Sequence, residues 1–332
     1  MNQLLDHILA CRTQADYYRL AIMAECNAVP SDMAVLFRHM DRLPKESLEW
    51  AERTRALMFA QADIVQPFRR TLVSSHVAFF TTRQAPDEPR DLILACCGLV
   101  DRLQVPISVV LQHLDGRRFD VLLVRDPTRR IYLQGVPDYG SDLRLVAERI
   151  RRDVNLDAYR SVCSLGTSGG GWASFILGSL LGADRAISMS GKPPGLTFRL
   201  ARMWEKQGYS LDKDNAGFGV FQQLFDSIPD PSTRLLAFFG ADYRDDREGA
   251  EAFEQMVGAV GIGFRGIDTH NLMGTIVERR RLATFLDYYL TGDLGKIVPP
   301  AGQRTVELDS FDQPGGRPGT AAVGEQHAPG GA

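Results

Sequence analysis

The sequence predicts an α/β fold in which a mostly parallel, twisted sheet carries helices on both faces. Short apolar runs alternate with longer segments of helical periodicity over about residues 67–293. Several of these runs are apolar at successive positions, as in residues 92–97, which is typical of strands buried on both faces. Helical segments stand between the runs, as the crossover connections of parallel strands require.

Length and composition exclude several classes of protein. The chain has 332 residues, enough for about two domains at roughly 150 residues each. Its 38 Lys and Arg residues against 41 Asp and Glu residues give a net charge of −3, without the positive excess typical of nucleic-acid binding. No apolar run approaches the roughly 18 residues of a membrane span. We therefore expect neither a nucleic acid nor a membrane as partner.

Residues 1–66 predict a helical extension. Leu4, Leu5, Ile8 and Leu9 recur at helical spacing, and glycine is absent before Gly98. Apolar stripes of this kind need to be buried. The sequence leaves open whether they pack on the rest of the chain, on a second copy in a homo-oligomer, or on a partner protein.

Residues 67–293 predict the α/β domain. Strands are predicted at 72–82 (one strand or a pair), 92–97, 119–124, 159–165, 186–189, 234–239 and 263–267. Helices are predicted at 142–152, 172–181, 249–260 and 275–290. The alternation is interrupted over about residues 192–230, where we expect a short helical lid with an apolar lining. Residues 303–332 are rich in Gly, Pro and Ala and predict a disordered tail.

The cysteines favour a reducing compartment. Five cysteines cannot all pair, and none has the C-x-x-C spacing of a zinc site. The first residues lack the basic start and long apolar run of a signal peptide. We therefore expect a cytoplasmic protein with reduced thiols and no metal site.

The sharpest motif is Gly166-Thr167-Ser168-Gly169-Gly170, which lies between a predicted strand and a predicted helix. This is the G-x-S-x-G pattern in the strand–turn–helix context that it requires. Gly166 and Gly170 allow a turn too tight for side chains, which holds Ser168 in a strained conformation with its hydroxyl projecting. The alternative is a plain connecting or phosphate-binding loop, but neither the Rossmann nor the P-loop pattern fits these residues.

A serine nucleophile needs a base. The sequence offers six histidines: His7, His39, His76, His113, His270 and His327. His270 alone lies between a late predicted strand and the last predicted helix, where it could reach Ser168 across the carboxyl edge of the sheet. We therefore expect His270 to be the base.

The third member of a triad is a carboxylate that orients the imidazole. Asp242 lies just past the strand predicted at 234–239, at the same edge of the sheet as Ser168. Asp245 and Asp246 compete with it, although Asp246 stands where a helix begins and could serve as its N-cap. The sequence favours Asp242 and leaves Asp245 and Asp246 open.

The order Ser168, Asp242, His270, each just past a predicted strand, resembles the α/β-hydrolase superfamily over about residues 70–292. The resemblance implies acyl transfer to water or another acceptor, with no metal and no cofactor. It also implies an oxyanion hole made by the backbone N–H of Gly169 and a second N–H after an earlier strand. The matching residue is Leu99 in Cys97-Gly98-Leu99, where cysteine replaces the usual histidine of the family.

The expected function is a serine hydrolase that cleaves a carboxylic ester or thioester through an acyl-enzyme on Ser168. The substrate would be a small molecule or a carrier-bound acyl group. Two alternatives remain. One is an acyltransferase that uses the same triad with an acceptor other than water, and the other is a binding module without catalysis.

Overall fold

The computed structural model describes residues 3–60, 64–82, 89–197, 223–228, 232–293 and 305–308. These residues form one sheet with the strand order β1-β2-β4-β3-β5-β6-β7-β8-β9. The strands are β1 (Arg69–Leu72), β2 (Val77–Thr81), β3 (Asp91–Cys96), β4 (Phe119–Val124), β5 (Ser161–Thr167), β6 (Arg185–Met189), β7 (Arg234–Gly240), β8 (Val260–Phe264) and β9 (Thr305–Val306). β1 and β2 run antiparallel to their neighbours, and the remaining strands are parallel. The predicted mostly parallel sheet is confirmed.

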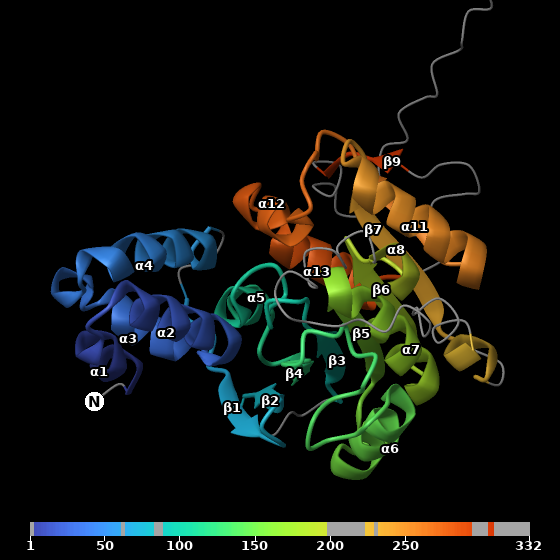
Figure 1. The fold of residues 1–332 in the computed structure, drawn as a ribbon, viewed down its shortest axis with the longest axis horizontal. Helices are drawn as coiled ribbons and strands as arrows, with labels where there is room; N and C mark the ends of the chain where they lie inside the picture. The colour runs from blue at the N-terminus through green and yellow to red at the C-terminus, as the bar shows by residue number, and fades with distance from the viewer. Residues whose placement is uncertain are drawn as a thin grey trace, which may run out of the picture.

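Helices cover both faces of this sheet (Figure 1). In the first half of the chain they are α1 (Gln3–Ala10), α2 (Gln14–Asn27), α3 (Pro30–Phe37), α4 (Lys45–Met58), α5 (Ile107–His113) and α6 (Leu143–Asp153). They continue with α7 (Gly171–Leu181), α8 (Pro194–Thr197), α11 (Arg244–Val257), α12 (Leu272–Glu278) and α13 (Leu282–Thr291).

The core consists of two clusters, one on each face of the sheet. In β3, Ile93 and Ala95 belong to one cluster with side chains of α5, α12 and α13. Leu92 and Leu94 belong to the other, with side chains of α6, α7 and α11. Because successive side chains of a strand point to opposite faces, a strand covered on both sides must be apolar throughout.

The first four helices lie together at one end of the molecule, beside α5 (Figure 1). Thr13 and Asp16 form a capping box that starts α2, and Pro30 occupies the first turn of α3. Met33 and Leu36 are buried in the same cluster as the α5 face of the sheet. The helical extension therefore packs on the rest of the chain and shares its core.

Three predicted elements in the second half are corrected. The helix predicted at 249–260 is α11, which ends at Val257 because Gly258 adopts φ 67° and caps it. The strand predicted at 263–267 is accordingly β8, three residues earlier. The helix predicted at 275–290 is divided into α12 and α13 around Arg280, whose φ is 58°.

Helix α5 was not predicted. All of its residues are buried, including the polar Ser108, Gln112 and His113, so no exposed polar face gives the sequence a helical period.

The predicted disordered tail is corrected for residues 305–308. Thr305 and Val306 pair with β8 as a parallel edge strand, and Leu308 is buried in the core. Two β-branched residues and one leucine among Gly and Pro are too short a pattern to signal a strand. Residues 309–332 lie outside the described residues, as does most of the predicted lid at 192–230.

In the part of the chain that the structure describes, no helix is both long and apolar enough to cross a membrane. All five cysteines are free.

Candidate active site

Ser168 occupies the turn between β5 and α7, at the carboxyl edge of the sheet. Its φ is 50°, in the left-handed region that residues with side chains rarely adopt. A side chain on Gly166 would overlap the carbonyl oxygen of Gly170, and one on Gly170 would overlap the carbonyl oxygen of Cys96. The turn is therefore as tight as the motif predicted, and the two glycines are required by backbone contact.

His270 links Ser168 to a buried carboxylate. Its Nε2 lies 2.9 Å from Ser168 Oγ, and its Nδ1 lies 2.8 Å from Asp246 Oδ1. The His270 side chain is 43% exposed, whereas the Asp246 side chain is fully buried. Because the carboxylate accepts from Nδ1, it favours the tautomer in which Nε2 is free to accept the serine proton.

The choice of carboxylate is corrected. Asp242, which the sequence favoured, does not contact the imidazole, because its Oδ2 accepts the backbone N–H of Gly266 at 2.8 Å. Asp245 pairs with Lys192 at 3.2 Å. Asp246 lies in the first turn of α11, and the N-cap of this helix is Tyr243. Asp246 therefore does not have the N-cap role that the sequence left open.

The His270 loop is held by a side chain that the sequence analysis did not single out. Gln104 Nε2 donates to the carbonyl oxygen of His270 at 2.6 Å, and Gln104 Oε1 accepts the N–H of Met273 at 3.0 Å. Asn271 caps α12 by accepting the N–H of Gly274. No local motif marks Gln104, because its partners lie more than 160 residues away in the chain: 166 for His270 and 169 for Met273.

Tyr243 lies beside the histidine, with its ring centroid 6.2 Å from that of His270. Partial burial raises the pKa of Tyr243, and the carboxylates of Asp246 and Asp245 raise this pKa further. Tyr243 is therefore a neutral hydroxyl at physiological pH.

The two predicted oxyanion donors border the serine. A side chain on Gly98 would come within 3.3 Å of Ser168 Cβ, and one on Gly169 within 3.3 Å of Leu99 Cγ. The loop after β3 turns back on itself where Gly98 N–H donates to the carbonyl oxygen of Arg102 at 2.9 Å. Among the described residues, no acceptor takes the N–H of Leu99. Gly169 N–H stands in the first turn of a helical segment, where no intrahelical acceptor exists.

The two cysteines at the end of β3 belong to the core. Cys96 and Cys97 are fully buried, and burial raises the pKa of each thiol. The carbonyl oxygen of Cys97 accepts the Tyr132 hydroxyl at 3.0 Å. Both side chains are therefore protonated core residues. In the described part of the chain, no group of three or more His, Cys, Asp or Glu side chains is arranged to hold a metal ion.

Comparison with known proteins finds likeness in structure only. No protein-family model and no curated protein matches the sequence. The acylaminoacyl peptidase of Pyrococcus horikoshii is 12% identical, with a TM-score of 0.45 over 67% of this chain and 41% of that chain. An α/β-hydrolase enzyme from a lagoon-sediment metagenome is 14% identical, with a TM-score of 0.39 over 67% of this chain and 98% of that chain. The capsule O-acetyltransferase of Neisseria meningitidis serogroup A is 11% identical, with a TM-score of 0.43 over 67% of this chain and 96% of that chain.

Proposed function

We propose that this chain, which has the α/β-hydrolase fold, is a serine hydrolase that cleaves a carboxylic ester or thioester. The observation that carries the proposal is the hydrogen-bonded series Ser168–His270–Asp246, with the serine held at φ 50°. A serine hydroxyl, an imidazole and a buried carboxylate in this order form the arrangement that generates an alkoxide-like nucleophile.

In the acylation step, Ser168 Oγ attacks the carbonyl carbon of the substrate while His270 Nε2 takes the hydroxyl proton. The carbonyl oxygen becomes negatively charged, and the backbone N–H groups of Gly169 and Leu99 stabilise it. The bond to the leaving alcohol or thiol then breaks, and His270 returns the proton to that group. Asp246 stabilises the positively charged imidazolium through Nδ1.

In the deacylation step, water takes the place of the leaving group. His270 removes a proton from the water, the resulting hydroxide attacks the acyl carbon, and the carboxylic acid leaves Ser168 with its hydroxyl restored. These steps need only the residues of the site and use no metal or cofactor. If an alcohol or amine reaches the acyl-enzyme before water does, the same steps transfer the acyl group to that acceptor.

We also propose a cytoplasmic location, since all five cysteines are free, which suits a reducing compartment.

A panel of esters and thioesters with acyl chains of two to twelve carbons tests the proposed reaction. We expect release of the free acid from at least one member, measured by mass spectrometry of the products. Repeating the assay with added glycerol and hydroxylamine distinguishes hydrolysis from transfer, since a transferase would give mainly the acylated acceptor. Absence of both products across the whole panel would favour the non-catalytic alternative.

A further inference from the structure

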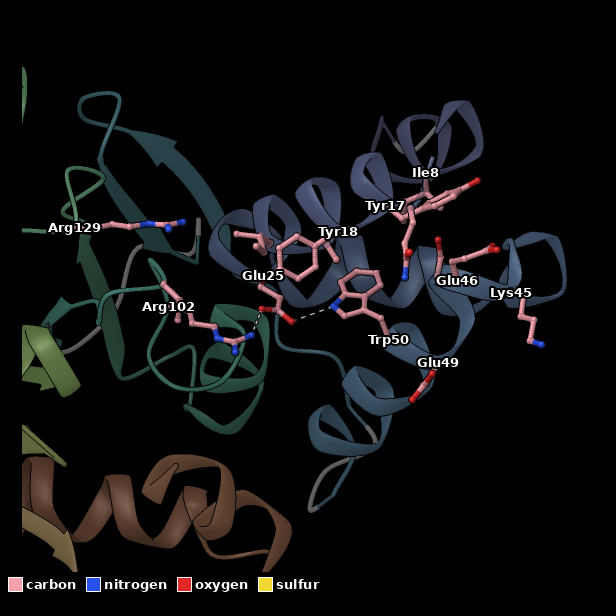
Figure 2. Close-up of a pocket in the computed structure, with 15 residues that line it drawn as sticks. Ile8, Tyr17, Tyr18, Glu25, Lys45, Glu46, Glu49, Trp50, Arg102 and Arg129 are labelled. Atoms are coloured by element: carbon pink, nitrogen blue, oxygen red, sulfur yellow. Dashed lines mark hydrogen bonds and ion pairs between the residues drawn. The ribbon is translucent and has the colours of Figure 1, made fainter. Parts of the chain in front are cut away.

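A cavity of about 700 Å³ lies between α2, α4 and the loop that follows β3 (Figure 2). This volume is in the range of small-molecule sites. Its lining follows one stripe on each helix: Tyr18, Ala21 and Glu25 on α2, and Glu46, Glu49 and Trp50 on α4. Since residues three and four apart share one face of a helix, two facing helix surfaces form the cavity.

This cavity extends to the loop that carries His270. A second cavity of about 300 Å³ shares Trp50 and Arg102 with the first and is also lined by Asn271, the residue after His270. On the other side, Val100 lines the first cavity. Its Cα lies within about 7.6 Å of that of Gly98, because consecutive Cα atoms are 3.8 Å apart. Gly98 borders Ser168. The two cavities together form a groove, here called the arm groove, that reaches the His270 loop at Asn271 and Gln104.

One carboxylate of the arm groove is already neutralised. Arg102 and Trp50 approach Glu25 from opposite sides, with an ion pair from Arg102 Nη1 and a 3.1 Å hydrogen bond from Trp50 Nε1 (Figure 2). These contacts join α2, α4 and the loop after β3. They also fix the plane of the Trp50 ring, which is half-buried.

Other charged groups of the arm groove form no hydrogen bond or ion pair within the part of the chain that the structure describes, although Arg129 interacts electrostatically with Asp101. They include the side chains of Glu46, Glu49 and Arg129. Tyr18 is 70% exposed, so its ring is open to a ligand. The arm groove therefore offers free acceptors, a free donor and two aromatic rings.

We propose that the arm groove binds the alcohol part of the substrate and that this alcohol is a neutral saccharide. That the saccharide is the alcohol part of an ester rests on the proposed esterase function. That a saccharide binds in the arm groove does not. Each sugar hydroxyl both donates and accepts, so different hydroxyls of one ligand can use the carboxylates of Glu46 and Glu49 on one side and the guanidinium of Arg129 on the other (Figure 2). The C–H face of a sugar ring packs on aromatic rings such as those of Tyr18 and Trp50.

Two other classes of ligand fit less well. The charged side chains of the arm groove balance one another, so a phosphate-bearing group would meet no excess of positive charge: Glu25, Glu46, Glu49 and Glu278 against Lys45, Arg53, Arg102 and Arg129. A long acyl chain would remove water from the carboxylates of Glu46 and Glu49 without giving them a hydrogen bond, which is costly. A neutral polyhydroxylated ligand avoids both disadvantages.

Binding to the full-length Ser168→Ala protein tests the proposal without turnover. We would measure saturation-transfer NMR signals with cellobiose, lactose, maltose and N,N′-diacetylchitobiose, and in parallel with coenzyme A and octanoate. At least one saccharide is expected to bind. Tyr18→Ala and Glu49→Gln should each weaken that binding about tenfold, the usual effect of losing a contact to a charged or aromatic group. Glu251→Gln, an exposed site on α11, is the matched control and should leave binding unchanged.

The proposal is overturned if none of the saccharides binds, if coenzyme A or octanoate alone binds, or if the groove variants leave saccharide binding unchanged. Because the Ser168→Ala protein already lacks the nucleophile, none of these results depends on the triad. Failure of the proposed esterase function would instead appear as an unreactive Ser168 in the wild-type protein.

Discussion

Replacement of Ser168 by alanine is expected to lower kcat by a factor on the order of 10³ or more toward any ester that the wild-type protein cleaves. The variant lacks the oxygen that attacks the carbonyl carbon, and neither His270 nor the backbone N–H groups can replace it. Initial rates at saturating substrate give the factor directly.

The fold should survive this change. Ser168 Oγ is hydrogen-bonded to His270, and removing it leaves the glycines of the turn in place. The thermal melting temperature is therefore expected to stay close to the wild-type value. Ser75→Ala, at an exposed serine between β1 and β2, is the matched control and should retain full activity. A Ser168→Ala protein with near wild-type turnover would mean that another group performs the chemistry.

Replacement of Asp246 by asparagine is expected to lower kcat by about 10²- to 10⁴-fold. The asparagine amide can donate to Nδ1, which would hold the imidazole in the tautomer that cannot take the serine proton. The loss would also remove the negative charge that stabilises the imidazolium. Steady-state kinetics at fixed pH, with the melting temperature as a check on folding, measure the effect.

Asp242→Asn is the matched control for this carboxylate. Among the described residues, the Asp242 side chain makes one hydrogen bond, which it accepts from the N–H of Gly266. An asparagine oxygen can accept the same N–H. We therefore expect less than a tenfold loss of kcat, within the range of a preserved neutral hydrogen bond. A larger loss from Asp242→Asn than from Asp246→Asn would contradict the observed contact to His270.

The parts of the site that could be predicted are those fixed by local geometry. The turn at Ser168 needs Gly166 and Gly170 because neighbouring backbone leaves no room for side chains, and this requirement is visible in five consecutive residues. His270 could be predicted because, of the six histidines, it alone lies between a late predicted strand and the last predicted helix. The parallel sheet could be predicted from apolar runs that alternate with helical segments, because a strand covered on both faces must be apolar throughout.

The correct carboxylate could not be predicted, because the sequence suggested a helix start at Asp246, two residues after the actual start of α11 at Arg244. Residues 244–248 are all charged, Arg-Asp-Asp-Arg-Glu, so no apolar period marks the first helical turn. The helix begins at Arg244, which turns Asp246 inward to the imidazole. Asp242 then lies outside the helix and stabilises the neighbouring loop.

The contact between the helical extension and the catalytic loops was also beyond prediction. Glu25 and Arg102 are 77 residues apart, and their pairing depends on how α2 packs beside the loop after β3. An apolar stripe shows that a helix must be buried but not which surface covers it. The extension and the α/β domain therefore form one core, and the arm groove follows from that packing.

The central claim is that Ser168 is the nucleophile of an acyl-enzyme mechanism, and covalent labelling by a fluorophosphonate tests it most directly. Intact-protein and peptide mass spectrometry should find one phosphonyl group per chain, on Ser168. The label should be absent from Ser168→Ala, slow to form in Asp246→Asn and formed at the wild-type rate in Asp242→Asn. A wild-type protein that remains unlabelled, or that carries the label on another residue, would contradict the account.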